Sequence, residues 1–529
     1  MNVPPGRFEL PTFGSKPNMI SISLWGQFTF YIILIKLKNG NKYDIIYKIM
    51  IIPKEVTTII ERLEKAGFEA YIVGGCVRDF ILGKEPKDWD VATNAKPEGI
   101  QKVFPDSFYE NKFLTVTART SSQIIPEIEI TTYRLEAGYS DKRHPDELRY
   151  AKTIEEDLAR RDFTVNAIAM DKNKNIIDLF DGKKDLKKKI IRAVGKANER
   201  FNEDALRMLR AVRFATVLDF TIEEATKDAI QKNSIWLEAV SQERIRDELV
   251  KIIMADKPEV GIEMLRELSL LKYVLPELLE NYGVGQNKHH IYDCYTHALK
   301  ALQFTAKKKL DLDVRLAALF HDIGKPRTKV GQGKDSTFYN HEVVGAKMTF
   351  EALDRLKFPK KQVEKIAKLV RYHLFYYNVE EVGESSVRRL VKNVGPSHME
   401  ELLQLRQADR IGSGVPKAEP YKLRHLKYVI EKVSKDPISP KMLKVNGKDI
   451  MRLLNVQPGP RVGYMLNILL SEVIDDPKRN DKKYLEDKVK ELGNLNEKEL
   501  EKIAEKSKER VESMEKKEDE MTKAKYWVT

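Results

Sequence analysis

Two aspartates separated by one residue, Asp88 and Asp90, are the strongest chemical feature of this sequence. In a strand, residues two apart point to the same face. Two carboxylates held together are costly unless a cation lies between them, and a divalent metal carrying a nucleoside triphosphate would fit. Upstream, Gly74 and Gly75 follow an apolar run and precede an expected helix start, where backbone N–H groups can approach phosphates. The alternative is a surface turn with two solvated acids.

A third carboxylate and a group of cations fit the same phosphate chemistry. Glu129 lies on an expected strand and would complete a two-metal site for phosphoryl transfer, although an edge-strand glutamate is usually just solvated. Arg160 and Arg161 are adjacent cations that could clamp a triphosphate, because each guanidinium offers a bidentate fork. Asp162 and Asn166 supply groups suited to ribose hydroxyls. A helix start with scattered ion pairs is the plain alternative.

A predicted helix over residues 203–215 carries Asp204, Arg207 and Arg210 at intervals of three, which places them on one face. The ordinary interpretation is an intrahelical ion pair, worth about 0.2–0.5 kcal/mol. The sharper interpretation is base reading. An arginine that donates to the ring nitrogen and an aspartate that accepts from the exocyclic amine would suit both cytosine and adenine. Uracil and guanine carry N–H at that ring position and would leave buried groups unpaired.

A second constellation lies in the middle of the chain, where four of the nine histidines occur among predicted helices. A lone helical histidine is usually a packed or surface residue, but here an adjacent His-Asp pair is followed by further histidines and an aspartate. The members are His297, His321, Asp322, His341, His373 and Asp409.

The elements that would position these residues indicate an α+β fold. Helix and short β-branched strands alternate between about Val56 and Met170, and from about Asp178 onward apolar periodicity is almost wholly helical. The strands are expected at 70–73, 89–93, 113–118 and 128–133. We therefore expect a small mixed-sheet head followed by mostly α-helical domains.

Composition narrows the partners and the compartment. The chain has 529 residues, 93 Lys+Arg and 80 Asp+Glu, for a net charge of +13, so a polyanionic partner is plausible. Only two cysteines are present, Cys76 and Cys294, too few for a disulfide framework or a Cys-type zinc site. A reducing, cytoplasmic setting fits.

The first 49 residues do not conform to the rest of the chain. The stretch from Ile20 to Leu37 is apolar but marginal for a membrane span, and it lacks the features of a signal peptide. We expect the folded protein to begin near Met50, with an extension or a misassigned start before it. A membrane anchor is the minority interpretation.

Five motifs in series now carry a family resemblance. Gly-Gly-x-x-Arg-Asp, Asp-x-Asp, Glu-x-Thr-Thr-x-Arg, Arg-Arg-Asp-Phe-Thr-x-Asn-Ala and the run from Asp178 to Leu186 resemble a class II tRNA nucleotidyltransferase, over about Met50 to Asn480. This family adds CCA to tRNA, and its relatives include bacterial poly(A) polymerases. The resemblance implies Mg²⁺ in the head, held by catalytic Asp88, Asp90 and Glu129. It implies that CTP and ATP are bound by Gly74, Gly75, Arg78, Arg160, Arg161, Asp162, Asn166, Asp204, Arg207, Arg210 and Arg213.

Two segments bear on which nucleotides are added. The stretch from Leu135 to Tyr150, with Gly138, Tyr139, Asp141, Arg143, His144 and Pro145, resembles the flexible loop of CCA-adding and A-adding members. Enzymes that stop after CC typically lack it. The additional Arg-rich segment usual in poly(A) polymerases of this class is missing from residues 113–124. CCA addition therefore leads, and A-only addition stays open.

The histidine and aspartate set resembles the HD phosphohydrolase superfamily. The resemblance implies that His297, His321, Asp322, His341, His373 and Asp409 are ligand candidates and that Lys325 contacts phosphate. Mixed imidazole and carboxylate ligands suit Mg²⁺ or a divalent transition metal better than a closed structural zinc. The metal would activate water for hydrolysis of RNA-end or nucleotide phosphates.

Other matching segments predict support and RNA contacts. In the resembling family the motif at Asp204 and Arg207 serves as a protein template for the nucleotide, and Glu243 and Arg244 resemble the family's next motif, which implies that they brace this templating helix. Lysines 183, 184 and 187–189 could meet tRNA backbone, and a solvated lysine face is equally compatible. The stretches 446–449 and 458–463 resemble the family's terminal helical module, with glycines that would permit close phosphate approach.

We expect six segments and three competing functions. The segments are an extension at 1–49, a nucleotidyltransferase head at 50–175, a helical neck at 176–282, an HD domain at 283–412, a tRNA-binding module at 413–480 and a charged tail, an exposed helix or disordered, at 481–529. The leading function is CCA addition to tRNA from CTP and ATP without a nucleic-acid template, combined with phosphohydrolysis. No membrane partner is expected. The alternatives are an A-adding or poly(A) enzyme, an HD phosphohydrolase with a tRNA-binding head, and RNA binding without catalysis.

Overall fold

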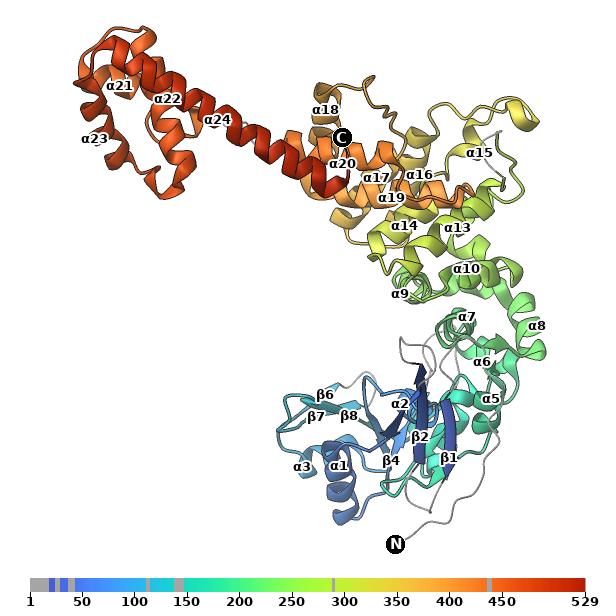
Figure 1. Cartoon of the computed structure of the whole chain (residues 1–529). Coiled ribbons are helices and arrows are strands. Elements are labelled where there is room, and N and C mark those ends of the chain that lie inside the picture. The colour runs from blue at the N-terminus through green and yellow to red at the C-terminus, as the bar shows by residue number, and fades with distance from the viewer. Residues whose placement is uncertain are drawn as a thin grey trace. The chain divides into compact units, whose positions relative to one another are not determined.

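The computed structural model describes residues 19–23, 29–36, 43–110, 115–137, 147–287, 291–434 and 440–528. These residues fall into two compact units. The first contains residues up to 284 with 293–316 and 348–363, and the second contains 285–292, 317–347 and residues from 364 onward. The α+β fold class is confirmed: a small mixed sheet is followed by helices (Figure 1).

The head is built on a seven-stranded sheet in the order β12-β11-β4-β5-β8-β7-β6. Strands β6, β7 and β8 lie side by side in Figure 1. Only β5 and β8 pair in parallel; the other neighbours are antiparallel. The strands are β4 (Ala70–Val73), β5 (Asp90–Thr93), β6 (Ser107–Glu110), β7 (Thr115–Arg119), β8 (Glu127–Thr132), β11 (Ala169–Met170) and β12 (Ile176–Ile177).

Short helices and one hairpin complete the head. Helix α1 (Lys54–Lys65) forms because its apolar residues recur at helical spacing and can be buried on one face. These residues are Val56, Ile59, Ile60 and Leu63. The remaining elements are α2 (Gly75–Ile81), α3 (Pro97–Val103), β9 (Arg134–Ala137), β10 (Glu147–Tyr150), α4 (Ile154–Ala159) and the 3-10 turn η2 (Thr164–Asn166).

Helices dominate the rest of the first unit, and α7 packs against α9 and α10. Strands β13 (Ile190–Ile191) and β14 (Thr221–Ile222) pair in parallel. The helices are α5 (Gly182–Lys188), α6 (Ala197–Glu203), α7 (Leu206–Leu218), α8 (Glu224–Asn233), η3 (Ser234–Ala239), α9 (Gln242–Ile253), α10 (Pro258–Glu267), α11 (Leu271–Val274), α12 (Pro276–Leu279) and α13 (Cys294–Lys307).

The second unit is helical among its described residues, and three helices contribute residues to both units: α14 (Leu312–Phe320), α16 (His341–Arg355) and α17 (Lys360–Tyr372). The others are α15 (Lys325–Thr328), η4 (Gly333–Asp335), α18 (Glu384–Val394), η5 (Pro396–His398), α19 (Met399–Gly412), α20 (Tyr421–Ser434), η6 (Pro440–Met442), α21 (Gly447–Leu454), α22 (Pro460–Asp475), η7 (Pro477–Arg479), α23 (Lys482–Gly493) and α24 (Glu497–Tyr526).

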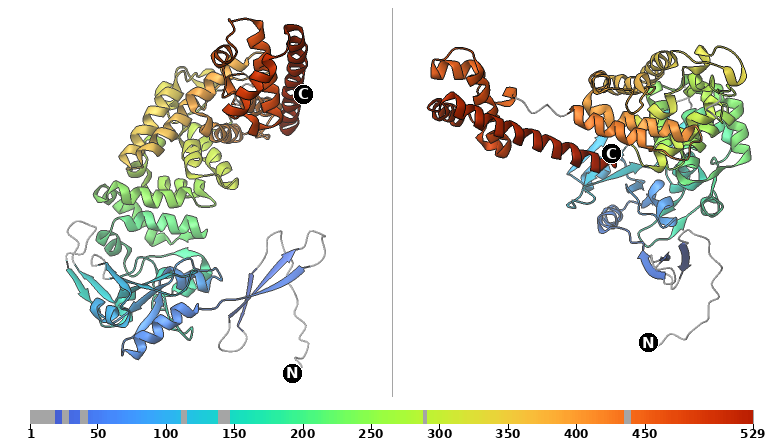
Figure 2. Two further views of the ribbon diagram at one scale, coloured as in Figure 1. Left: turned by 90° about the vertical axis from the view of Figure 1, so that its left-hand side faces the viewer. Right: turned by 45° about the horizontal axis from the view of Figure 1, so that its top comes forward.

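The charged C-terminal stretch takes part in a hydrophobic core. Leu485, Val489 and Leu492 of α23 and Leu500 of α24 are buried in one cluster with residues of α21 and α22. This core crosses residue 480, where the sequence placed a boundary. The sequence analysis missed this core because apolar residues are sparse in the stretch. A few apolar residues per turn are nevertheless enough to bury one face of a helix. Farther along, α24 lies against α20 (Figure 2), where the Tyr428 hydroxyl donates to Asp519.

The described part of the N-terminal extension is a sheet. Strands β1 (Met19–Ser23), β2 (Thr29–Lys36) and β3 (Tyr43–Ile49) pair antiparallel in the order β1-β2-β3, seen in the left view of Figure 2. The apolar stretch that raised the membrane-anchor alternative thus contributes strands. In the part of the chain that the structure describes, no helix combines the length and apolar character needed to cross a membrane.

Candidate functional sites: a carboxylate head and a histidine pocket

The parallel pairing of β5 and β8 brings two of the three predicted acids together. Asp90 and Glu129 are Cα partners in the register, so their side chains project side by side from one face of the sheet. Asp88 lies in the bend before β5 and not on the strand, so the expected same-strand geometry is wrong in that detail. Asp88 and Glu129 are exposed, whereas Asp90 is half-buried.

The electrostatics of Asp90 show that these acids act on one another. Burial is the main cause that raises the pKa of Asp90 to about 6, and the charges of Glu129 and Asp88 raise it further against the opposing effect of Arg161. A divalent cation would relieve this repulsion, and oxygen donors are those that Mg²⁺ prefers. The three carboxylates are not among the tightest groups, however: within the described residues, groups with all ligand atoms within 4.8 Å contain only histidines and Asp322.

The glycine turn upstream fits tightly around an arginine. Gly74 has φ +80°, and a Cβ built there would lie 2.9 Å from Nη1 of Arg161. The Gly74 amide donates to the Ile168 carbonyl at 3.3 Å. That amide is therefore committed to the fold and not free for a phosphate, unlike the sequence-based expectation. What the turn provides is room for the guanidinium, while Gly75 begins α2.

Arg160 and Arg161 are both anchored on a buried acid, Asp157, which the sequence analysis did not single out. Arg160 Nη2 lies 2.6 Å from Asp157 Oδ1, and Arg161 Nη2 lies 3.0 Å from Oδ2. Burial acts to raise the pKa of Asp157, but the two arginines outweigh it and hold that pKa below its ordinary value. Asp157 thus fixes the two cations, with Arg161 close to Asp90 and Gly74.

The other predicted nucleotide residues form linked pairs. Arg78 Nη1 donates to Asn166 Oδ1 at 2.8 Å. Arg210 Nε donates to Asp162 Oδ2 at 2.7 Å. Burial would raise the pKa of Asp162, but Arg210 and Arg207 outweigh it and lower that pKa. In the described structure Asp162 and Asn166 therefore hold arginines, and any contact with ribose would be additional.

A phenylalanine that the sequence analysis did not identify lies among three of these arginines. The guanidinium carbons of Arg78, Arg210 and Arg213 lie 5.5, 5.5 and 3.8 Å from the centroid of the Phe214 ring. Arg213 Nε also lies 2.9 Å from Oε2 of buried Glu248. Burial lowers the pKa of Arg213 to about 10, with Glu248 opposing that shift. The result is a cationic, partly desolvated wall.

Each member of the predicted templating pair, Asp204 and Arg207, has an ion-pair partner of its own. Helix α7 begins at Leu206, and Asp204 lies between α6 and α7 with φ −143°, so the expected continuous helix at 203–215 is wrong at its start. Asp204 Oδ2 pairs with Arg244 Nη2 at 2.6 Å. Arg207 pairs with Glu203 and donates to the carbonyls of Arg200 and Arg160 at 3.2 and 3.3 Å. Arg244, expected to act as a brace, contacts the predicted templating residue Asp204 directly.

Three histidines of the second unit share one orientation. Nδ1 of His321, His341 and His373 lies 2.8, 2.7 and 2.7 Å from the carbonyl oxygens of Ala318, Phe338 and Val370, each three residues upstream. A carbonyl only accepts, so Nδ1 carries the proton and Nε2 presents its lone pair when the ring is neutral. This arrangement is typical of histidines that ligate a metal through Nε2.

The three Nε2 atoms converge on one carboxylate. They lie 3.3, 3.3 and 3.6 Å from the oxygens of Asp322 for His321, His341 and His373, and Asp409 Oδ1 lies 3.7 Å from Nε2 of His321. Burial lowers the pKa of His321, but Asp322 and Asp409 outweigh it and raise the pKa to about 10. The cluster therefore favours added positive charge, and its mixed donors suit Mg²⁺ or a divalent transition metal.

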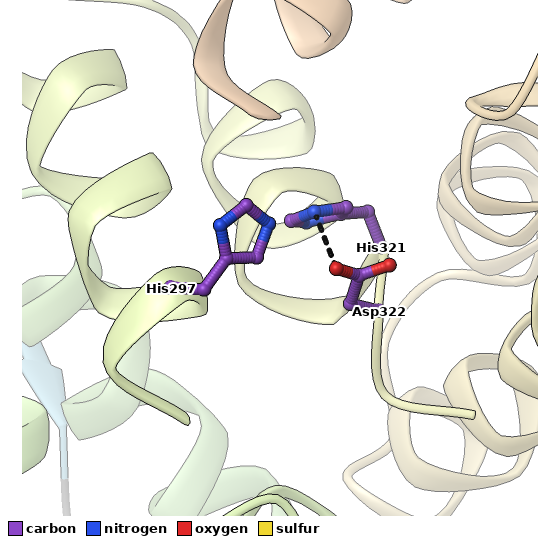
Figure 3. A group of neighbouring side chains, drawn as sticks. All are labelled: His297, His321 and Asp322. Atoms are coloured by element: carbon purple, nitrogen blue, oxygen red, sulfur yellow. Dashed lines mark ion pairs between the residues drawn. The ribbon is translucent and has the colours of Figure 1, made fainter. Parts of the chain in front are cut away.

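The sixth predicted ligand, His297 on α13, is fully buried. It belongs with His321 and Asp322 to a group whose ligand atoms lie within 4.8 Å of one another; Figure 3 shows the three side chains and the His321–Asp322 ion pair. A second group contains Asp322, His341 and His373. Asp322 is common to both groups, which makes it the centre of the candidate metal site.

A pocket of about 820 Å³ opens beside Asp322, His341, His373 and Asp409. Lys325, the predicted phosphate contact, lines it but is engaged: its Nζ donates to Asp322 Oδ2 at 2.5 Å and to Gln286 Oε1 at 2.6 Å. Its ammonium group therefore occupies Asp322 Oδ2, an oxygen that a bound metal ion would also need. Lys325 therefore holds charge at Asp322 in this structure, and its role toward phosphate stays a prediction.

The remaining predicted contacts have simpler settings. Lysines 183, 184 and 187–189 are exposed on and after α5. Asn446 caps α21 with a capping box, and Gly459 precedes α22. Residues 138–146, the core of the predicted flexible loop, lie outside the described residues, and its arms are the antiparallel strands β9 and β10.

Comparison with known proteins finds family models that match both parts of the chain. The model of the poly A polymerase head domain matches residues 70–192, the probable RNA- and SrmB-binding site of polymerase A matches 219–281, and the HD domain matches 294–412. The CCA-adding enzyme of Ligilactobacillus salivarius is 35% identical over 449 residues, which cover 83% of this chain and 96% of that enzyme. The CCA-adding enzyme of Lactobacillus delbrueckii subsp. bulgaricus is 50% identical over 199 residues, 37% of this chain and 49% of that enzyme.

A solved structure supports the same assignment. The Bacillus stearothermophilus CCA-adding enzyme in complex with CTP aligns with a TM-score of 0.52 and 27% identity, covering 83% of this chain and 96% of that one. The long alignment with the Ligilactobacillus enzyme covers far more of this chain than the head alone. The chain belongs to the family of CCA-adding enzymes.

Proposed function

We propose that this protein builds or repairs the 3′-terminal CCA of tRNA from CTP and ATP without a nucleic-acid template. The observation that carries the proposal is the register pair Asp90–Glu129, with Asp88 beside it and Arg161 facing it. The primer 3′-hydroxyl would attack the α-phosphate, and pyrophosphate would leave. Mg²⁺ bound to these three carboxylates would supply charge stabilisation and an activated hydroxyl. The relatives named CCA-adding enzymes, one of them solved with CTP, support this substrate choice.

The protein's own side chains would select and hold the nucleotide. Arg161, fixed by Asp157, lies beside the acids, where it can bind phosphate oxygens. Asp204 and Arg207 would read the base edge, and each is held by a partner, Arg244 or Glu203. Such preorganisation reduces the cost of ordering side chains when a nucleotide binds.

An extension assay tests this function and its rival. Purified protein is incubated with tRNA lacking CCA and with each labelled nucleotide separately and in combination. We expect two C residues with CTP alone, one further A when ATP is added, and no extension with UTP or GTP. Incorporation from ATP alone onto that primer would replace the proposal with A-only or poly(A) addition, and no incorporation at all would reduce the head to an RNA-binding module.

The glycine turn offers a test of how Arg161 is positioned. Gly74→Ala puts a Cβ 2.9 Å from the Arg161 guanidinium, so we expect the KM for CTP to rise by about tenfold, the loss of one charge-assisted contact. Gly67→Ala is a matched control, because Gly67 has φ +86° but nothing within 4 Å of its Cβ. Both variants should lose stability from strained backbone, measured by thermal unfolding. An equal KM in the two variants would contradict the role of Gly74.

We also propose that the HD centre hydrolyses phosphoesters at RNA ends or on nucleotides. The shared Nδ1-to-carbonyl anchoring, which turns three Nε2 atoms toward Asp322, favours this second function. A divalent metal there would activate water; water oxygen bonds to phosphorus, one P–O ester bond breaks, and the proton passes to the leaving alcohol. Such a reaction would restore tRNA ends with a free 3′-hydroxyl for the head.

Removing the shared carboxylate tests the hydrolase. We expect Asp322→Asn to reduce hydrolysis of adenosine 2′,3′-cyclic phosphate by at least about a thousandfold, because the residue joins both ligand groups. Nucleotide addition by the same sample should be unchanged, and Asp354→Asn, at an exposed position of α16, should keep both activities. Chelation followed by return of Mn²⁺, Ni²⁺ or Mg²⁺ identifies the metal. Hydrolysis that survives Asp322→Asn would place it elsewhere.

We place this activity in the cytoplasm. Both cysteines, Cys76 and Cys294, are free and buried, as expected where thiols stay reduced, and nucleoside triphosphates and tRNA occur together there.

A further inference from the structure

The HD pocket is larger than a phosphate ion requires. Its volume of about 820 Å³ falls in the range of roughly 300–1,000 Å³ typical of sites for small molecules and cofactors. Metal-ligand candidates form one part of its lining, and polar, charged and aromatic residues together with Leu374 and Val415 form the rest. The space is sufficient for a nucleoside attached to the reacting phosphate.

Three cationic side chains line this pocket, and two of them are already engaged. Lys325 donates to Asp322 and Gln286. Arg406 Nη1 donates to Asp409 Oδ2 at 2.7 Å, and its guanidinium carbon lies 5.6 Å from the centroid of the Phe375 ring. Arg406 therefore orients a metal-ligand candidate. These two cations are positioning groups and have charged or aromatic partners of their own.

Arg410 differs from both. It lies one turn after Arg406 on α19 and directly follows Asp409, and its buried Nε has no hydrogen-bond partner among the described residues. No side-chain ion pair of Arg410 occurs in the described part of the chain either. A buried Nε–H group without a hydrogen-bond partner is costly, and a phosphate oxygen bound there would accept its hydrogen bond.

An exposed aromatic side chain lines the same pocket. Tyr339 is 78% exposed although it lies two residues before the buried ligand candidate His341. Leu374, directly after His373, is 53% exposed and also lines the pocket. Large exposed side chains beside a polar site are typical of recognition surfaces, and an aromatic ring offers a platform on which any base can stack.

We propose that Arg410 binds the non-reacting phosphate oxygen in the HD pocket and that Tyr339 stacks on the adjoining base, so that this pocket takes a terminal nucleoside phosphoester. The inference rests on the proposed hydrolase function and adds its phosphate-binding and base-recognising residues. The phosphoester can come from a free nucleotide or from an RNA end, and both present the same chemistry. Phosphate and base are recognised by different side chains, which makes the two contributions separable.

The phosphate role is tested with two cyclic diesters, adenosine 2′,3′-cyclic phosphate and the base-free glycerol 1,2-cyclic phosphate. We expect Arg410→Ala to raise the KM for both by about ten- to hundredfold, with kcat changed much less. Inhibition by inorganic phosphate should weaken in parallel, and Arg410→Lys should recover part of the binding. Arg388→Ala, an exposed arginine of α18 paired only loosely with Glu384 at 3.7 Å, is the matched control.

The base role is tested with the same substrates. We expect Tyr339→Ala to raise the KM for the adenosine diester by about five- to hundredfold, the range of stacking on one base, and to leave glycerol 1,2-cyclic phosphate unchanged. Tyr339→Phe should behave as the original protein. A tRNA ending in a 2′,3′-cyclic phosphate, compared with the free nucleotide, identifies the source by its kcat/KM.

The outcomes separate this inference from the function on which it rests. If the unaltered protein with Mn²⁺, Ni²⁺ or Mg²⁺ hydrolyses neither diester, the proposed hydrolase function fails. If it hydrolyses them but Arg410→Ala leaves the KM and phosphate inhibition unchanged, or Tyr339→Ala affects both diesters equally, the inference fails while the hydrolase stands. Thermal unfolding reports the folding of each variant, and Arg410→Gln replaces Arg410→Ala if that variant does not fold.

Discussion

Loss of nucleotide addition is the expected result when Asp88 and Asp90 are both replaced by alanine. Asp90 is half-buried beside Glu129, and burial, helped by the charge of Asp88, raises the pKa of Asp90. These carboxylates are therefore the groups suited to hold the catalytic cations. We expect kcat for CTP addition to fall by at least about a thousandfold, since cation binding provides several kcal/mol of charge stabilisation. Single-turnover addition of labelled CMP to tRNA lacking CCA measures it.

Two controls make this result specific. Glu127→Ala removes an acid from the same strand as Glu129, two residues away, and should leave addition nearly unchanged. Hydrolysis by the HD centre in the double variant should continue, which shows that the protein is folded. If addition persists at even a tenth of its original rate, the cations are held elsewhere and the head site is wrongly assigned.

Relaxed base selection is the second large effect that we expect. When Asp204 and Arg207 are replaced by alanine, the donor and acceptor that would discriminate against UTP and GTP disappear. A site built to hydrogen-bond its substrate rejects mismatched analogues by about 10⁴–10⁵, and we expect at least a hundredfold of this preference to be lost. The ratio of kcat/KM for CTP to that for UTP measures the change. Most of it should come from slower use of CTP.

The partners of these two residues supply a graded comparison. Arg244→Ala removes the side chain that holds Asp204 at 2.6 Å and should weaken selection less than loss of Asp204 itself. Arg266→Ala, which breaks an ion pair with Glu263 within α10, should have no effect on selection. Unchanged discrimination in the Asp204 and Arg207 double variant would exclude them as the template.

Much of the head was predictable because local patterns dictate it. The expected strands at 70–73 and 128–133 correspond to β4, a short apolar run, and β8, in which buried and outward-facing residues alternate. The sequence analysis wrongly placed Asp88 and Asp90 on the same strand, because β5 begins only at Asp90. The break before α7 was also missed, since residues 203–206 are compatible with a continuous helix and tertiary contacts decide otherwise.

The supporting residues of the sites could not be found by sequence reasoning. Asp157 looks like one acid among several in a short helix, yet it is buried under two arginines. Phe214 lies on the same helix as Arg210 and Arg213, but Arg78 and Glu248 come from other helices and meet it or its neighbours only in the folded chain. The candidate metal ligands could be named from residue type, but the ring orientation of His321, His341 and His373 depends on hydrogen bonds to backbone carbonyls that the motifs do not specify.

The parallel register between β5 and β8 has a consequence for how this family can vary in length. Asp90 faces Glu129 only because the two strands are aligned residue for residue. Gaining or losing a single residue within β8 would turn Glu129 to the opposite side of the sheet. Substitutions at neighbouring positions are therefore far easier to tolerate than indels, and evolutionary changes in chain length should collect in the connections outside these two strands.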